Sequence, residues 1–320
     1  MRDGAGPSTY AVTEERSTLT ATLPSVAPGD ALRGRVCLVT GASRGLGKET
    51  ALGLARLGAT VVILARDERL ATAAADDVSR RSGNYEVSVV VADLASFAAV
   101  RAAAAQLRER YTAIHVLVHN AGVNLARRRL SVDGFELTLA VNHLAPFLLT
   151  HELLPLLRRG AADGGARIVT VTSMFERFGR FDFTDPQGTR RWIGPFAYTQ
   201  SKLANVLFTF ELATRLAGSG ITANCVDPGL VATDLMREHV LFRPHWLKAV
   251  WGRVLSTPER GARAAVYAAS APELATVTGR CLDRSGRVIS TSRRSRTPAM
   301  RARLWELSER LTGVKLEGKP

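Results

Sequence analysis

The amino-acid sequence predicts an α/β protein, a doubly wound, Rossmann-type sheet of seven parallel strands with helices on both faces, in a single domain. From residue 35 onward, short runs rich in β-branched residues alternate with stretches rich in Ala and Leu, which is typical of repeated βα units. The 320 residues, 46% of them hydrophobic, suffice for one sizeable core and do not require a second domain.

Seven apolar runs predict the strands, and the Ala- and Leu-rich segments between them predict the helices. The strands are expected at Val36–Thr40, Thr60–Leu64, Val87–Val91, Val116–His119, Arg167–Thr172, Thr222–Val226 and near Arg280–Leu282. Helices are expected to begin near Gly45, Glu68, Phe97, Phe135, Ala197 and Pro258. Ligands of such sheets bind at the carboxyl ends of the strands, so functional residues are expected there.

The two ends of the chain differ in composition from its centre. Residues 1 to 32 contain Gly, Pro, Ser, Thr and scattered charges, which predicts a disordered polar arm. The folded domain is expected over residues 33 to 313, followed by a short tail over residues 314 to 320. No stretch is apolar for about eighteen residues without interruption, so neither a membrane span nor a signal-peptide core is expected.

Cysteines and histidines show no metal-binding or disulfide pattern. Cys37, Cys225 and Cys281 lie far apart in apolar runs, which favours buried, reduced thiols in a cytoplasmic protein. His119 and His143 fall inside longer motifs and are interpreted as structural residues. We therefore expect no bound metal.

Positive charge is concentrated near the end of the chain. The net charge is +14, and residues 284 to 303 contain seven arginines and no acid. A block of like charge is usually an exposed surface, so this stretch is interpreted as a solvated basic tail surface. Binding of a polyanion such as nucleic acid is the alternative, but no nucleic-acid partner is expected.

A glycine-rich turn joins the first predicted strand to the first predicted helix. Gly41 allows a tight turn, Gly45 lets the backbone approach a pyrophosphate, and Gly47 lets the helix pack closely on the sheet. The helix N-terminus adds partial positive charge facing the phosphates. Because a strand precedes the turn and an amphipathic helix follows it, the turn indicates a dinucleotide site.

The residue after the second predicted strand bears on the choice of dinucleotide. Arg66 stands where such folds read the adenine ribose, and a guanidinium suits the 2′-phosphate of NADP. Arg44, inside the glycine turn, supplies a second cation. NADP(H) is therefore favoured, while the neighbouring Asp67 leaves NAD(H) open.

A phenol and an ammonium are four residues apart on one predicted helix. Tyr198 and Lys202 therefore share a helix face, and the ammonium is expected to lower the pKa of the phenol from its usual value near 10. Ser173, at the end of the fifth predicted strand, is expected to hydrogen-bond the same substrate oxygen. Together these side chains predict proton exchange with a carbonyl or alcohol oxygen during hydride transfer.

These motifs, in this order, resemble the short-chain dehydrogenase/reductase superfamily, over roughly residues 34 to 313. The segments 133–136, 141–144 with 147–150, 201–208 and 304–308 are most similar to those of its retinol dehydrogenase group. The resemblance implies four catalytic residues: Asn142, Ser173, Tyr198 and Lys202. It implies that the cofactor is held by Gly41, Ser43, Arg44, Gly45, Leu46, Gly47, Arg66, Asp93, Leu94, Asn120, Ala121, Gly122, Tyr198, Lys202, Pro228, Gly229 and Thr233.

The resemblance also assigns duties to individual residues and shows two departures. Lys202 is expected to hold the nicotinamide ribose, Asn142 to orient a water behind Lys202, and Thr233 to contact the carboxamide. His119 stands where the family usually has Asn, which is expected to change one local hydrogen bond. Membrane retinol dehydrogenases typically begin with an apolar anchor, whereas this chain begins with a polar arm, which weakens retinoid as the substrate.

Aromatic residues flank the predicted reacting centre. Phe175, Phe178, Phe181, Phe183, Trp192 and Phe196 precede Tyr198, and Leu235, Met236, Phe242, Trp246 and Trp251 follow Thr233. A hydrophobic substrate pocket is the favoured interpretation. A satellite core, a homo-oligomer contact and weak contact with a membrane surface are the alternatives.

The sequence thus predicts an NADP-dependent oxidoreductase that interconverts a hydrophobic alcohol and its aldehyde or ketone. One alternative is a ketoreductase that tailors a polyketide-like or steroid-like metabolite. Another is a non-enzymatic NADP-binding regulatory protein, against which the joint presence of the four candidate catalytic residues argues.

Overall fold

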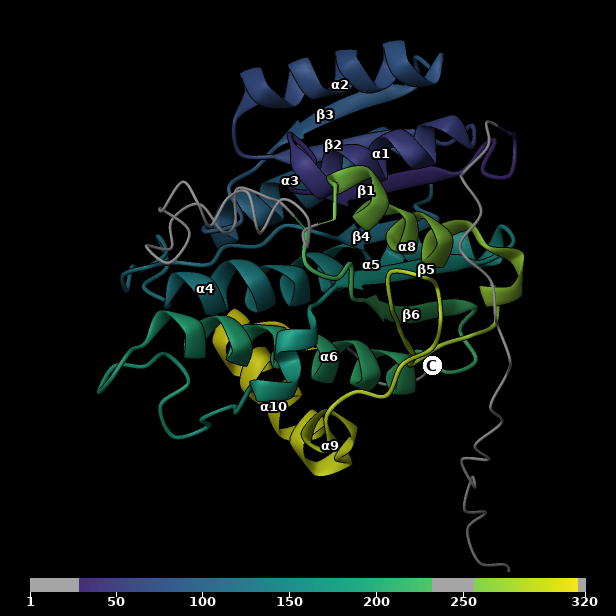
Figure 1. Ribbon diagram of the computed structural model, residues 1–320. Helices are drawn as coiled ribbons and strands as arrows, with labels where there is room; N and C mark the ends of the chain where they lie inside the picture. Colours follow the sequence, from purple (N-terminus) through teal and green to yellow (C-terminus); the bar gives the residue numbers. More distant parts are fainter. Residues whose placement is uncertain (1–28, 232–255, 316–320) are drawn as a thin grey trace, which may run out of the picture.

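The computed structural model describes residues 29–231 and 256–315 (Figure 1). Its centre is one sheet of seven parallel strands in the order β3-β2-β1-β4-β5-β6-β7, as predicted. The strands are β1 (Val36–Thr40), β2 (Thr60–Ala65), β3 (Val87–Val91), β4 (Val116–His119), β5 (Ala166–Val171), β6 (Ile221–Val226) and β7 (Cys281–Leu282).

Helices cover both faces of the sheet. The longer ones are α1 (Gly45–Arg56), α2 (Glu68–Ser82), α3 (Phe97–Arg110), α5 (Ala145–Ala162), α6 (Gly194–Arg215), α8 (Pro258–Ser270) and α10 (Pro298–Thr312). The shorter ones are α4 (Leu137–Leu139), the π turn η1 (Ala140–Leu144), α9 (Arg293–Arg296) and the 3-10 turns η2 (Met174–Phe178) and η5 (Pro272–Leu274).

Alternating side chains of the strands divide the interior into two cores. Cys37 and Val39 of β1 pack with α1, α2 and α8, whereas Leu38 packs with α3, α5, α6 and α10. This period of two, with apolar residues on both faces, is expected of a parallel strand covered by helices on both sides. The doubly wound fold therefore follows from strands that are hydrophobic throughout.

Side-chain caps explain why several helices begin where the sequence predicts. Asp67 accepts a hydrogen bond from the Leu70 amide at the start of α2, and Ser96 accepts one from the Ala99 amide at the start of α3. Thr257 caps α8 in the same way. These short polar side chains satisfy amide groups that the first helical turn leaves unpaired.

Two predicted helix starts differ from the structure. The sequence predicts a helix from near Phe135, but α4 begins at Leu137, because Glu136 accepts hydrogen bonds from the amides of Thr138 and Leu139. The chain then makes the π turn η1 before α5. The sequence also predicts a helix from near Ala197, but α6 begins at Gly194, where a proline fits the first turn.

The basic stretch of residues 284 to 303 is folded and is not a tail, but six of its seven arginines are exposed, as expected of a solvated basic surface. It contains the turns that follow β7, the short helix α9 and the start of α10. Ser295, in α9, is fully buried. Helix α10 has no counterpart among the predicted elements and lies against α6 (Figure 1). Trp305 of α10 is buried and stacks on Phe208 of α6.

The three cysteines are buried and form no disulfide, as predicted. Burial raises the pKa of Cys37 to about 12. Cys225 and Cys281, distant in sequence, are register partners on β6 and β7. Within residues 29–231 and 256–315, no helix is long and apolar enough to cross a membrane.

Candidate active site

The glycine turn after β1 packs against the turn that follows β4. Gly41 has φ of 66°, and a Cβ built on it would lie 2.8 Å from the Ala121 Cα. A Cβ on Gly47 would lie 2.4 Å from the Asn120 Nδ2 atom. Both positions therefore require glycine, one for its backbone angle and both for the close approach.

Hydrogen bonds fasten these two turns to each other. Asn120 donates from Nδ2 to the Thr40 carbonyl at 2.9 Å. The Thr40 hydroxyl accepts from the amides of Asn120 and Ala121, at 3.0 and 3.1 Å. Strand order reverses between β1 and β4, so this contact marks the topological switch point, where doubly wound sheets bind ligands.

His119, which takes the place of the family's usual Asn, points away from this turn. It is buried, and its Nε2 lies 2.7 Å from the Thr150 hydroxyl of α5. Burial lowers the pKa of His119 to about 3, so the ring is neutral. His143 is likewise buried, contacts the Ser308 hydroxyl at 2.7 Å, and has its pKa lowered by burial to about 3. Both are structural residues, as predicted.

The four candidate catalytic residues converge on one end of α6. Ser173 follows β5, and its hydroxyl lies close enough to the Tyr198 phenol to lower the pKa of that phenol. The Lys202 ammonium lies 5.6 Å from the centre of the Tyr198 ring and donates to the Val171 carbonyl at 3.1 Å. A phenol, a hydroxyl and an ammonium therefore meet beside the carboxyl end of β5.

Asn142 lies in the π turn η1 and is completely buried. Its amide group accepts from the Val123 amide at 2.7 Å and donates to the Val123 carbonyl at 3.0 Å. It also donates to the Ser201 hydroxyl, next to Lys202, at 2.9 Å. A Cβ on Gly122 would lie 3.4 Å from the Asn142 Oδ1 and 3.7 Å from the Lys202 Nζ, so this glycine adjoins both side chains.

Burial dominates the acid-base properties of the pair. It raises the pKa of the Tyr198 phenol, and the nearby Ser173 hydroxyl opposes this only partly. It lowers the pKa of Lys202 to about 8. The pKa of Tyr198 is therefore raised, against the expectation that Lys202 lowers it, and the phenol keeps its proton at neutral pH.

Asp227 is a residue that the sequence reasoning missed. It follows β6, is 8% exposed, and accepts a hydrogen bond from the Gly229 amide at 2.9 Å. Burial raises its pKa, and its charge acts on both Tyr198 and Lys202. An acid immediately before the Pro-Gly turn at the end of a strand was the signal that could have identified it.

The remaining predicted cofactor residues lie at the carboxyl ends of the strands, with one outside the described residues. Ser43 and Arg44 lead into α1, and Gly45 and Leu46 are its first residues. Arg66 is exposed after β2, and Asp93 and Leu94 follow β3. Pro228 and Gly229 follow β6, with Gly229 at φ of 74°. Thr233 lies outside the described residues, as do Leu235, Met236, Phe242, Trp246 and Trp251.

The aromatic residues before Tyr198 divide into two groups. Phe175 packs edge-on against the Tyr198 ring at 6.5 Å between centroids, and Phe178 and Phe196 are 70% and 67% exposed. Phe181 is buried in the core and Phe183 packs against it, so the prediction that they line a substrate pocket is wrong. Trp192 donates to the Glu136 carboxylate at 3.2 Å.

No group of three or more His, Cys, Asp or Glu side chains in the described ranges could hold a metal ion. The functional groups of the candidate site are instead the backbone of the glycine turn, the Ser173 hydroxyl and the Tyr198/Lys202 pair. Residues 35–243 match the family model described as short chain dehydrogenase. The chain belongs to the short-chain dehydrogenase/reductase family.

Similar proteins include several that are named as retinol dehydrogenases. Retinol dehydrogenase 11 from Homo sapiens is 37% identical over 286 residues, 89% of this chain and 88% of its own length. Dehydrogenase/reductase SDR family member 13 from Bos taurus is 41% identical over 290 residues, 88% of this chain and 74% of its own. This short-chain dehydrogenase/reductase is therefore most like the retinol dehydrogenase group.

Solved structures show the same fold. An uncharacterized protein from Mycobacterium Paratuberculosis is 36% identical, has a TM-score of 0.71, and covers 92% of this chain and 96% of its own. The Pseudomonas aeruginosa RhlG/NADP active-site complex is 31% identical, with a TM-score of 0.65 and coverage of 82% and 98%. The short-chain dehydrogenase/reductase is thus an NAD(P)-dependent oxidoreductase that acts on a small molecule.

Proposed function

We propose that this short-chain dehydrogenase/reductase uses NADP(H) to interconvert a hydrophobic alcohol and its aldehyde or ketone. The observation that carries the proposal is the buried Tyr198 phenol, which lies beside Ser173 and one helical turn from Lys202, with its pKa raised by burial. A buried phenol that holds a proton beside a hydroxyl is suited to protonate a substrate oxygen.

Each side chain of the group has a separate role in this proposal. Tyr198 gives its proton to the substrate oxygen during reduction and takes it back during oxidation. Ser173 hydrogen-bonds the same oxygen and stabilises the negative charge that develops on it. Lys202 places positive charge behind the phenol. Asn142 hydrogen-bonds Ser201, the residue before Lys202, and so holds this part of α6 in place.

The residues at the switch point fit a dinucleotide. Neighbouring atoms leave no room for a side chain at Gly41 or Gly47. The turn therefore presents backbone amides and the start of α1 to a pyrophosphate. Asn120, Ala121 and Gly122 form the wall between this turn and Lys202. When bound, the nicotinamide supplies or accepts the hydride.

NADP is favoured over NAD because of two neighbouring residues after β2. The Arg66 side chain is exposed and its guanidinium suits a 2′-phosphate. The Asp67 carboxylate accepts from the Leu70 amide at 2.9 Å as the cap of α2, so it is already engaged. The similar RhlG structure is a complex with NADP.

Replacing Arg66 tests the cofactor preference. Arg66→Asp removes the cation that faces the 2′-phosphate and adds an anion that repels it. We expect the ratio of kcat/KM for NADPH to that for NADH to fall by roughly tenfold or more. Arg69→Asp, at an exposed arginine in the first turn of α2, is the control. An unchanged ratio in Arg66→Asp contradicts the preference.

Exposed apolar side chains next to Tyr198 support a hydrophobic substrate. Met174, Phe175, Phe178 and Phe196 are 45%, 36%, 70% and 67% exposed. Oxidation of NADPH followed with long-chain aldehydes, retinal, aromatic ketones and quinones tests the substrate class. Turnover confined to small hydrophilic carbonyl compounds would contradict the hydrophobic assignment while leaving the chemistry in place.

A further inference from the structure

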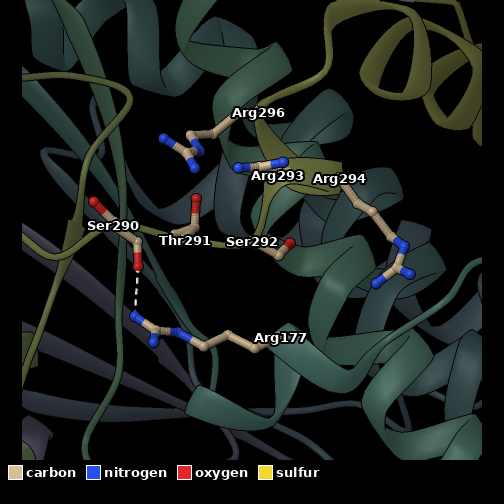
Figure 2. Close-up of a pocket in the computed structure, with 7 residues that line it drawn as sticks. All are labelled: Arg177, Ser290, Thr291, Ser292, Arg293, Arg294 and Arg296. Atoms are coloured by element: carbon tan, nitrogen blue, oxygen red, sulfur yellow. Dashed lines mark hydrogen bonds between the residues drawn. The ribbon is translucent and has the colours of Figure 1, made fainter.

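A pocket of about 520 Å³ opens beside η2, apart from the candidate dinucleotide and proton-transfer residues. Its walls come from η2, from the segment between β7 and α9, and from α9 itself (Figure 2). Four of the side chains that line it are arginines and three carry hydroxyls: Arg177, Ser290, Thr291, Ser292, Arg293, Arg294 and Arg296.

Two of the arginines are fixed by the backbone and two are not. Arg177 donates to the Ser290 carbonyl at 2.7 Å, as Figure 2 shows, and Arg294 donates to the Gly179 carbonyl at 3.4 Å. Among the described residues, no carboxylate or carbonyl engages the guanidinium of Arg293 or Arg296. The hydrogen-bonding capacity of the pocket is therefore largely unused.

One buried hydroxyl in the pocket wall also has no partner. Thr291 is 8% exposed, and its Oγ1 makes no hydrogen bond with the described residues. Figure 2 shows this oxygen pointing toward the side of the pocket where Arg293 and Arg296 lie. A buried polar atom without a partner is unfavourable, so a rotation of this side chain that brings the hydroxyl to an acceptor in the pocket would be favourable.

Nearby acids do not neutralise the four cations. The buried Glu176 carboxylate accepts from the Ser292 amide at 2.8 Å and holds the segment from behind. Asp227 interacts with the charge of Arg177 but hydrogen-bonds the Gly229 amide. With four arginines against two nearby carboxylates, Glu176 and Asp227, the pocket carries an excess of positive charge.

We propose that this pocket binds a phosphate group, distinct from the phosphates of the dinucleotide. A phosphate carries up to two negative charges and several acceptor oxygens, which matches guanidinium groups on two sides and the Thr291 hydroxyl. A carboxylate has one charge and two oxygens and would leave more of these donors unpaired. The phosphate belongs either to a free anion or to the headgroup of a lipid.

Calorimetric titration of the full chain, saturated with dinucleotide, with inorganic phosphate tests the site. We expect Arg293→Ser/Arg296→Ser to weaken phosphate binding by roughly tenfold or more. Thr291→Val, which keeps the shape and removes the hydroxyl, is expected to weaken it about threefold or more. Arg287→Ser/Arg310→Ser removes the same charge from positions outside the pocket and is the control.

Vesicles distinguish the two sources of the phosphate. Stronger retention on phosphatidate vesicles than on phosphatidylcholine vesicles, lost in Arg293→Ser/Arg296→Ser but not in the control, supports a lipid headgroup. Binding of inorganic phosphate without vesicle retention supports a free anion. Equal weakening by both arginine pairs would show a diffuse basic surface and overturn the proposal, as would no phosphate binding at about 10 mM, a weak affinity by any standard.

Discussion

At the scale of single residues, burial keeps the Tyr198 phenol protonated, and the Ser173 hydroxyl lies near it. We predict that Tyr198→Phe lowers kcat by about 10²-fold or more, because the general acid is lost while the ring still packs against Phe175. Dinucleotide affinity, measured by fluorescence titration, is expected to stay within about twofold. Turnover retained in Tyr198→Phe would refute the assignment of the proton donor.

Lys202 illustrates a functional group whose burial opposes stability. Its pKa is lowered to about 8 in the folded protein, so between pH 8 and its ordinary value of 10.5 the unfolded chain binds more protons. The cost of burying its charge is therefore fully present at pH 7 and declines as the pH rises through that window.

We predict that Lys202→Met abolishes turnover yet raises the free energy of unfolding at pH 7 by about 1–3 kcal/mol. The gain is expected to shrink above pH 8, where wild-type Lys202 loses its charge. Urea denaturation without dinucleotide at pH 7 and pH 9.5 measures both values. A variant less stable than wild type at pH 7 would show that the hydrogen bond to Val171 outweighs the burial of the charge.

At the scale of elements, the glycine turn brings β1 and β4 together at the candidate dinucleotide site. Gly47→Ala would place a methyl group 2.4 Å from Asn120 Nδ2 and 2.5 Å from the Gly41 carbonyl oxygen. We predict a loss of about 2 kcal/mol or more in stability and at least roughly tenfold in dinucleotide affinity.

Gly83→Ala at the end of α2 separates steric contact from backbone strain. Gly83 has φ of 75°, and an added methyl group would meet no atom of the described residues within 4 Å. Only the backbone strain of about 1–2 kcal/mol is therefore expected, with normal dinucleotide affinity. Thermal unfolding and fluorescence titration of both variants give the comparison. Equal affinity in the two variants would argue against close packing of the turns as a requirement for binding.

Local signals decide which elements the sequence can predict. Asp67, Ser96 and Thr257 are short polar residues next to apolar-periodic segments, and the helices after them begin where expected. The π turn around Asn142 is not predictable, because it depends on hydrogen bonds to Val123, nineteen residues earlier in the chain. Propensity and periodicity contain no information about such a distant partner.

At the scale of the whole molecule, sequence motifs predict the candidate cofactor residues better than aromatic content predicts the walls of the substrate pocket. The motifs assign Gly47 and Asn120 to the cofactor separately, and the structure places the two residues in contact. Phe181 is predicted to line a substrate pocket, but it lies in the core, since aromatic content alone cannot distinguish a binding surface from an interior. Asp227 escapes the sequence reasoning because its effect on Tyr198 arises only when β6 pairs with β5.

Two buried histidines link the layers of the molecule: His119 joins β4 to α5 through Thr150, and His143 joins η1 to α10 through Ser308. Burial lowers both pKa values from 6.5 to about 3. Between these values the unfolded chain binds more protons than the folded one, so stability falls as the pH drops below 6.5. Each histidine contributes a loss of about 1.4 kcal/mol per pH unit.

We therefore predict that the free energy of unfolding decreases by about 4 kcal/mol more between pH 7 and pH 5 than it would without these two histidines. His119→Asn, which restores the family's usual residue, is expected to remove about half of this pH dependence. Thr150→Val removes the hydrogen bond but keeps the imidazole, so it should lower stability similarly at both pH values. Urea denaturation at pH 5 and pH 7 measures all three proteins. A pH dependence in His119→Asn equal to that of the wild type would mean that His119 is already charged in the folded protein, and that its burial between β4 and α5 does not make the fold sensitive to acid.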